Sequence, residues 1–274
     1  MNRLDTKKQA QIIAALVEGN SIRATSRMTG AAKNTVIKLL VDVGTTCSEY
    51  QDKVFKNLPC TKIQCDEIWA FCYAKAKNVP EEKKDQFGYG DVWTFTAICA
   101  DTKLVPSWYI GNRDLVTATT FMKDLAGRLA NRVQLTTDGH AMYLDAVPSA
   151  FGRDIDYSQL IKIYGTSTES QGRYSPPHCT GVRAKEVLGY PEGRHVSTSY
   201  VERQNLTMRM NMRRFTRLTN AFSKKVENLG HAVALHFMYY NFCRIHQSLR
   251  CTPAMRAKVT DHLWEIEDIL ALLK

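Results

Sequence analysis

The first 45 residues carry apolar positions at the spacing of helices. A first apolar stripe ends just before Gly19, a residue type that commonly follows the last turn of a helix. The members of this stripe are Ile12, Ile13, Leu16 and Val17. The pattern therefore predicts that the chain begins with an amphipathic helix.

The next segment, "SIRATSRMTGAAKNTVIKLL", has the signals of two further helices joined by a tight turn. Ser21 is a helix-capping residue type, Met28 offers an apolar contact, and Gly30 allows the turn. The inward-facing positions of the last helix are Val36, Leu39 and Leu40. This layout predicts an N-terminal, all-α helix-turn-helix domain over residues 1–45.

The last of these helices would present four polar side chains outward: Lys33, Asn34, Thr35 and Lys38. A small three-helix bundle with a solvated polar face would give the same pattern. Basic residues outnumber acidic ones over residues 1–48, however, and that balance favours DNA binding through these four side chains.

After a predicted linker at 46–58 the periodicity changes to that of an α/β domain, expected over 59–250. Strands are predicted at 61–74, 91–101, 103–111, 132–140 and 157–165, and helices at 114–130 and about 140–150. The order is thus three strands, a helix, a strand, a helix and a strand. Such an alternation indicates a mixed sheet flanked by helices.

The remaining third of the chain is less regular. Residues 165–197 hold Gly, Pro and Ser with little periodicity, and a loop of this length in a compact domain is often functional. Two long helices are expected at 199–222 and 224–245. Residues 251–274 should add one or two C-terminal helices.

Composition narrows the classes of function. The chain has 274 residues and a formal net charge of +10, which favours a polyanionic partner without requiring one. Its eight cysteines form no CxxC pair, which argues against a zinc ribbon, and several lie in apolar runs, as buried thiols of a reducing compartment do. No signal peptide and no run of eighteen apolar residues is present, so a cytoplasmic protein without membrane spans is expected.

Three carboxylates occupy positions that suit metal chemistry. Asp66 lies inside an apolar strand, where a carboxylate is costly without a partner. Asp138 ends a strand and precedes Gly139, and strand ends are where α/β folds place ligands. Glu202 is the one acid in the basic run 198–217. Each acid alone is more often a capping or surface group, but the three together, without a His or Cys cluster, suit a hard divalent cation.

Helical geometry divides the basic run into two faces. The polar face would carry Glu202, Asn205, Arg209 and Arg213, and the apolar face Val201, Met208, Met212, Phe215 and Phe222. The apolar face should pack on the sheet. The basic and amide side chains, which are Arg203, Asn205, Arg209, Arg213, Arg214 and Arg217, would hold a phosphodiester backbone.

Four segments resemble the DDE transposases of the insertion-sequence-one type: "CDEIWAF" (65–71), "TTDGHAMY" (136–143), "STSYVERQNLTMRMNMRRFTRLTNAFSKK" (197–225) and "YYNFCRIHQSLRCTPAM" (239–255). The resemblance extends over about residues 22–256. It implies a ribonuclease-H-like fold and the catalytic, metal-binding triad Asp66, Asp138 and Glu202. It also implies two Mg²⁺ ions, for which Mn²⁺ can substitute.

The same resemblance implies the partners and the reaction. A homodimer or higher homo-oligomer would bind double-stranded DNA with terminal inverted repeats, cleave it and join it to target DNA, in a prokaryotic cytoplasm at the nucleoid. Members of the family typically carry a zinc-binding cysteine cluster before the helix-turn-helix, and this sequence has none there, so no zinc is expected.

Three questions stay open at the level of the sequence. Glu67 rivals Asp66 for the first position of the triad; because neighbours on a strand face opposite sides, only one should serve, and the resemblance selects Asp66. A catalytically silent DNA-binding protein would not need the acids. A ribonuclease-H-like nuclease or resolvase would use them without strand transfer.

Overall fold

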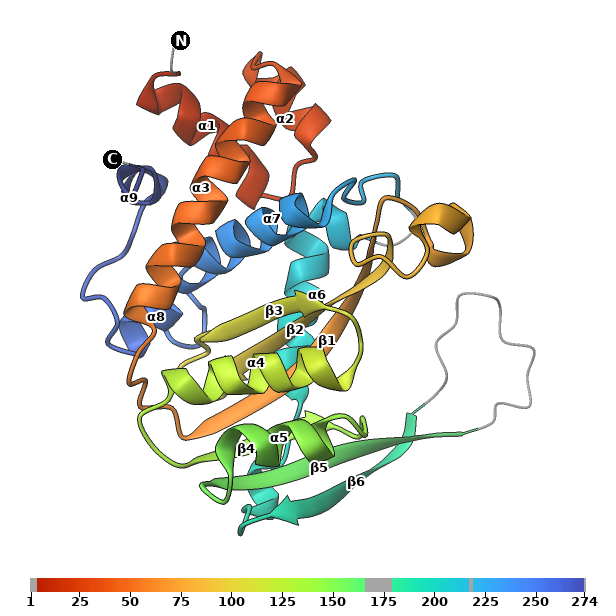
Figure 1. The fold of residues 1–274 in the computed structure, drawn as a ribbon. Helices are drawn as coiled ribbons and strands as arrows, with labels where there is room; N and C mark the ends of the chain where they lie inside the picture. Colours follow the sequence, from red (N-terminus) through yellow and green to blue (C-terminus); the bar gives the residue numbers. More distant parts are fainter. Residues whose placement is uncertain (1–3, 166–178, 217–218, 274) are drawn as a thin grey trace.

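A computed structural model describes residues 4–165, 179–216 and 219–273 of the chain (Figure 1). Its centre is a mixed sheet with the strand order β3-β2-β1-β4-β5-β6. The strands are β1 (Lys62–Cys72), β2 (Gly90–Cys99), β3 (Ser107–Gly111), β4 (Val133–Asp138), β5 (Ile155–Tyr164) and β6 (Cys179–Leu188). The β1–β4 and β4–β5 pairs are parallel, and the other three pairs are antiparallel.

Helices flank this sheet and extend beyond it at the N-terminal end (Figure 1). They are α1 (Thr6–Val17), α2 (Ile22–Thr29), α3 (Lys33–Val54), α4 (Leu115–Arg128), α5 (Tyr143–Phe151), α6 (Ser199–Asn211), α7 (Val226–Met238), α8 (Pro253–Arg256) and α9 (Ile266–Ala271). The predicted α/β class is confirmed. The predicted order of the first five strands and their two helices, α4 and α5, is confirmed as well.

The two faces of the sheet bury different cores because side chains alternate along each strand. On one face Cys65 and Phe95 pack with Phe121 of α4 and Tyr143 of α5. On the other face the side chains of β1 and β2 pack with α6 and α7. Members of this second core include Ile68, Val92, Val201, Met208 and Phe237. A residue of β1 is therefore directed toward either α4 and α5 or α6 and α7.

The N-terminal helices begin and end where their sequence signals lie. Ser21 caps α2 by accepting a hydrogen bond from the Ala24 N–H at 3.1 Å. Gly30 ends α2 in the left-handed conformation, with φ 69°. Met28, expected to make an apolar contact, is instead 65% exposed. Three helices are thus present at the predicted places, and DNA recognition by them stays a prediction.

The predicted linker at 46–58 is wrong for most of its length, because α3 continues without a break to Val54. Tertiary packing explains the difference. Val43 and Cys47 are fully buried in one core with α7 residues such as Ala234. Gly44 brings α3 so close to α7 that an added Cβ would lie 2.6 Å from the His231 backbone oxygen. The N-terminal helices therefore share a core with the α/β part of the chain.

Helix α6 is shorter than the helix predicted at 199–222. It ends at Asn211, and Met212 is extended, with φ −129° and ψ 104°. A single 3-10 turn follows at Arg213–Phe215. This break lets Met212 and Phe215 both reach the core between α6 and the sheet. The predicted apolar positions are therefore buried although the helix is not continuous, except Phe222, which is half-buried and lies outside this core.

Strand β6 is an element that the sequence analysis missed. It lies within the segment 165–197 that was expected to lack regular structure, and it pairs antiparallel with β5. Residues 166–178 of that segment lie outside the described residues, as does Arg217. The second predicted helix, at 224–245, is α7 followed by a π-helical turn at Tyr239–Cys243. The two helices expected at the C-terminal end are α8 and α9.

Within the part of the chain that the structure describes, none of the helices has both the length and the apolar character needed to cross a membrane.

Candidate active site

Two of the predicted acids come together because β1 and β4 are adjacent parallel strands. Their pairing ends with Cys65 opposite Thr137, and the next residues are Asp66 and Asp138. Asp138 is the last residue of β4, and strand ends are where α/β folds place their ligands, whereas Asp66 lies inside β1, which continues to Cys72. The two aspartates are thus fixed by backbone pairing.

A third carboxylate joins this pair from the opposite face of β1. One carboxylate oxygen each from Asp66, Glu67 and Asp138 lies within 4.8 Å of those of the other two. Opposite faces of β1 therefore do not keep Glu67 away from the site, and the choice of Asp66 as the triad member stays a prediction. The two side chains do leave β1 on opposite faces, but β4 ends beside them, so both can approach Asp138 around its end. We call Asp66, Glu67 and Asp138 the acidic cluster.

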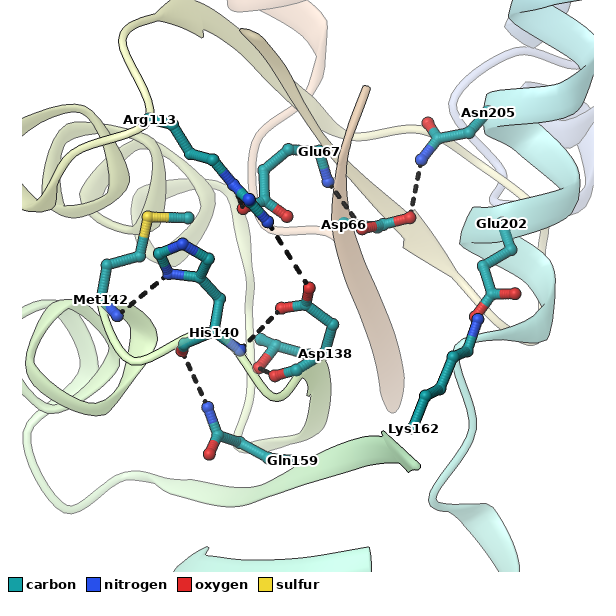
Figure 2. A network of polar contacts seen from close by, with 11 residues as sticks. Asp66, Glu67, Arg113, Asp138, His140, Met142, Gln159, Lys162, Glu202 and Asn205 are labelled. Carbon is teal, nitrogen blue, oxygen red and sulfur yellow. Dashed lines mark hydrogen bonds and ion pairs between the residues drawn. The ribbon is translucent and has the colours of Figure 1, made fainter. Parts of the chain in front are cut away.

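Hydrogen bonds orient Asp66 on two sides (Figure 2). Its Oδ1 accepts a hydrogen bond from the Glu67 N–H at 2.9 Å, and its Oδ2 accepts one from Asn205 Nδ2 on α6 at 2.8 Å. Asn205 is 8% exposed, and its own Oδ1 has no partner among the described residues. Asn205, which was predicted to contact DNA, thus holds the carboxylate of Asp66 in place.

Arg113, from the segment between β3 and α4, is the cation of the acidic cluster (Figure 2). Its Nε lies 3.3 Å from Glu67 Oε1, and its Nη2 lies 4.0 Å from Asp138 Oδ2. The guanidinium also stacks over Trp93, 4.5 Å from the ring centroid. Glu67 Oε2 is buried and has no partner in the described part of the chain. One arginine therefore compensates only part of the negative charge of the three acids.

The crowding of negative charge favours the protonated acids. Burial, and next the neighbouring Asp138, raise the pKa of Asp66 from 3.8 to about 6. Burial also raises the pKa of Glu67 from 4.5 to about 8, with Asp138 and Asp66 adding to the effect and Arg113 opposing it. A cation bound here would remove this penalty, because it stabilises the ionised carboxylates.

Glu202 approaches the acidic cluster from α6 (Figure 2). The first turn of α6 is tied to β1, since Gln64 Oε1 accepts hydrogen bonds from the Tyr200 and Val201 N–H groups at 2.8 and 3.2 Å. These N–H groups would otherwise lack partners at the helix start. Both Asp138 and Glu202 raise the pKa of Asp66, and Figure 2 shows the Asp66 side chain between them.

The Glu202 carboxylate is itself occupied. Lys162 of β5 forms an ion pair with it at 2.8 Å, and Thr198 Oγ1 donates a hydrogen bond to it at 2.5 Å. Glu202 is not among the three acids whose oxygens lie within 4.8 Å of one another. Of the predicted triad, Asp66 and Asp138 thus lie together, and Glu202 lies outside their cluster and is paired to a lysine.

His140 follows Asp138 and could have been either a DNA contact or a helix cap. Its backbone N–H donates to Asp138 Oδ1 at 3.1 Å, and its Nδ1 accepts from the Met142 N–H at 3.4 Å, just before α5. Its carbonyl accepts a hydrogen bond from Gln159. His140 thus holds the turn before α5 without capping the helix, and a contact of His140 with DNA stays a prediction.

Some of the side chains predicted to bind DNA are exposed to solvent, and others are half-buried. Lys33, Asn34, Lys38, Arg203 and Arg213 are exposed, whereas Thr35, Arg209 and Arg214 are half-buried. Lys38 forms an ion pair with Asp42 at 2.9 Å. Arg209 donates to the Phe215 carbonyl at 3.2 Å and Arg214 to Ser223 Oγ at 2.7 Å, so both help to hold the chain after α6.

The oxygen-rich donor set fits a hard divalent cation such as Mg²⁺ or Mn²⁺. Asp66 and Asp138 would hold it, with Glu67 within reach on one side and Glu202 on the other. The buried, unpartnered Glu67 Oε2 and Asn205 Oδ1 support this fit, because buried oxygens without partners are rare. All eight cysteines are free thiols, and they take no part in this site.

A scan against protein-family models finds no family that matches this chain, and a search of curated proteins finds no relative. The functional argument therefore rests on the geometry of the site.

Proposed function

We propose that this protein is a DDE transposase of ribonuclease-H-like fold, which cleaves DNA and transfers the cleaved strand to a target in a metal-dependent reaction. One observation carries the proposal. Asp66, inside β1, and Asp138, at the end of the adjacent parallel strand β4, are approached by a glutamate from a helix packed on the same sheet.

The topology agrees with this proposal. Strands β1, β2 and β3 form an antiparallel unit, and β4 and β5 continue the sheet in parallel with β1. A ribonuclease-H-like fold has this five-strand arrangement, with β6 as an addition at one edge. The predicted acids lie on β1, on β4 and on the later helix α6, the elements from which such a fold builds its site.

Asp66, Asp138 and Glu202 would hold two Mg²⁺ ions, which supply an activated water or 3′-hydroxyl and stabilise the leaving oxygen at phosphorus. Asp66 is the central ligand, because the other two acids lie on either side of it. Asn205 and the Glu67 N–H fix its orientation. Lys162 and Thr198 both contact Glu202 Oε1, so Glu202 would bind a cation through Oε2, or through Oε1 once Lys162 moves to a DNA phosphate.

The exposed basic side chains would hold the DNA. Arg203 lies one residue beyond Glu202, and Lys33 and Lys38 extend from α3. Each contact with a phosphate releases counterions, so binding should weaken steeply with salt. Double-stranded DNA with terminal inverted repeats, target DNA and further copies of this chain are the partners that we propose.

The experiment compares the wild type with Glu202→Gln on a plasmid carrying the DNA that flanks this gene, with Mg²⁺ or Mn²⁺. Gln keeps the size and the hydrogen bonding of Glu but removes the charge of a metal ligand. Nicked and joined products should form with the wild type and disappear in the variant, while DNA binding is retained.

Two results would contradict the proposal in different ways. Equal DNA binding without products from either protein points to a DNA-binding protein without catalysis. Nicked products without joined ones point to a nuclease or a resolvase.

A further inference from the structure

A second site of opposite charge lies between the N-terminal helices and the segment that follows α6. It is a cavity of about 730 Å³, lined by residues of α1, α2, α3 and α7 and by residues 211–214, 219–222 and 224. This volume is in the usual range for small-molecule sites, about 300–1,000 Å³. We call it the cationic cavity.

The charges that line this cavity are of one sign among the described residues. They belong to Arg23, Lys33, Arg213, Arg214 and Lys224. Within the described part of the chain none of the five forms an ion pair with a carboxylate. Cations gathered without acids are unfavourable unless an anion binds among them, and phosphate is the anion that Arg and Lys recognise most readily in such a group.

The rest of the cavity lining is apolar, which plain phosphate would not require. Leu16 and Ile37 contribute from the N-terminal helices, and Phe222 and Leu235 from the opposite side. A ligand that fills the cavity therefore needs an apolar or aromatic part as well as a negative charge.

A buried histidine contributes to the wall of the cavity. His236 of α7 lines the cavity, is only 6% exposed, and its Nε2 has no hydrogen-bond partner among the described residues. Burial lowers the pKa of His236 to about 3, so the ring is neutral at pH 7 and offers one donor and one acceptor. A neutral imidazole can form a hydrogen bond with a heteroatom of an uncharged ring.

We propose that the cationic cavity binds one phosphorylated nucleoside unit, with its phosphate among the five cations and its base against the apolar wall and His236. This inference rests on the proposed function for the identity of the occupant, an unpaired nucleotide of the DNA substrate. A free mononucleotide carries the same chemistry. Lys33 and Arg213 were predicted to bind DNA from two distant segments, and they line this one cavity.

The test is calorimetric titration of the full-length protein in EDTA with 2′-deoxyadenosine 5′-monophosphate, with deoxyadenosine and with inorganic phosphate. The nucleotide should bind, and each of the other two probes should bind at least about tenfold more weakly, because each lacks one half of the contacts. Lys33→Gln and Arg213→Gln should each weaken nucleotide binding about tenfold. His236→Phe should weaken nucleotide binding and leave phosphate binding unchanged, because the phosphate is held by the cations.

Lys53→Gln is the matched control. Lys53 is an exposed lysine on the same helix, about 30 Å further along it at 1.5 Å per residue, and it does not line the cavity. Its substitution should leave nucleotide binding unchanged. No binding of the nucleotide to the wild type, or equal binding to the wild type and to the Lys33 and Arg213 variants, would overturn the proposal.

A second arm identifies the source of the nucleotide. Wild type should bind a DNA duplex with a two-nucleotide unpaired extension more tightly than the blunt duplex, and Arg213→Gln should lose this preference. Binding of the free nucleotide without any such preference would overturn the assignment to DNA. Because the titrations contain no metal, nucleotide binding by a protein that fails to cleave DNA would count against the proposed function alone.

Discussion

The acidic cluster and the cationic cavity are two sites that each gather charge of one sign, and they are built in different ways. The acidic cluster is placed by strand pairing, with Asp66 and Asp138 one residue beyond the last β1–β4 pair. The cationic cavity is placed by tertiary packing, with Lys33 on α3 and Arg213 after α6. Strand pairing fixes the acids within a few ångströms of one another, whereas the cations surround a volume of about 730 Å³.

Because the charges are spaced differently, the two sites are suited to different ligands. Three carboxylate oxygens within 4.8 Å match the small coordination sphere of one metal ion or a pair of them. Five cations around an apolar wall match a larger anion with an aromatic part. Variants that affect one site and leave the other intact test the comparison directly.

The largest effect is expected from Asp138→Asn. The substitution removes a proposed metal ligand from the end of β4, so the proposed metal-dependent cleavage should fall by more than about 100-fold, the upper range seen for groups that only support metal ligands. Folding should be retained, since the change relieves repulsion with Asp66 and Glu67. Cleavage rates, thermal unfolding and nucleotide titration measure the three properties.

Asp145→Asn, an exposed aspartate of α5, is the control for that variant and should cleave as the wild type does. Loss of nucleotide binding in Asp138→Asn would contradict the independence of the two sites.

Gly44→Ala should damage the cationic cavity from a distance. The new Cβ would lie 2.6 Å from His231 Cβ and from its backbone oxygen, so α3 has to move away from α7. Such overpacking costs about 1–3 kcal/mol of unfolding free energy. Urea unfolding measures this loss, and nucleotide affinity should fall with it, since both helices line the cavity.

Gly127→Ala is the matched control for Gly44→Ala, because a Cβ at this helical position in α4 meets nothing within 4 Å. It should stabilise the protein by about 0.5–1 kcal/mol. Equal effects of the two substitutions would show that α3 and α7 are not packed as described.

The pH dependence of stability should report on Glu67. Its pKa is raised to about 8 in the folded protein from the ordinary 4.5, so between these values the folded state binds more protons than the unfolded state. Stability of the metal-free protein should therefore be greater near pH 4.5 and decline as pH rises toward 8. Thermal unfolding of the wild type and of Glu67→Gln in EDTA, from pH 5 to pH 8, measures the difference.

The decline should be smaller in Glu67→Gln, whose side chain does not ionise, and unchanged in Glu49→Gln, which alters an exposed glutamate of α3. Added Mg²⁺ should also reduce the decline in the wild type. An identical pH profile for the wild type and Glu67→Gln would show that Glu67 does not titrate in this range.

The smallest effect is expected from Lys162→Gln. Lys162 and Glu202 are both about one-third exposed, and ion pairs of this kind contribute about 0.2–1 kcal/mol. Removing the lysine frees Glu202, so the Mg²⁺ concentration for half-maximal cleavage should fall about two- to fivefold. Lys185→Gln, at an exposed lysine of β6, should not change it. A higher Mg²⁺ requirement in Lys162→Gln would mean that the lysine supports the site instead of blocking it.

The sequence was sufficient to predict the strands that carry the acids, because their periodicity and the turn at Gly139 are local signals. It was insufficient for the partners of those acids. Neighbouring residues of a strand face opposite sides, which was expected to keep Glu67 apart from Asp66, yet the end of β4 lets both side chains reach Asp138. Arg113 and Lys162 join the site through loop and sheet geometry that leaves no local trace in the chain.

The cationic cavity shows a further limit of sequence reasoning. Lys33 and Arg213 were predicted to bind DNA, but their meeting depends on the packing of α3 against α7 and on the end of α6 at Asn211. A continuous helix was predicted at 199–222 because Met212 and Phe215 continue the apolar spacing of α6 beyond its end at Asn211. The burial of His236, whose Nε2 has no hydrogen-bond partner among the described residues, likewise follows from tertiary structure alone.

The most direct test of the central claim is to count Mn²⁺ ions bound at equilibrium, in the presence of a DNA duplex, by the wild type and by Asp66→Asn. Asp66 lies between Asp138 and Glu202, so both ions should depend on it. The account predicts two ions for each wild-type chain and at most one, weakly held, in the variant. Equal stoichiometry and affinity in the two proteins would contradict it.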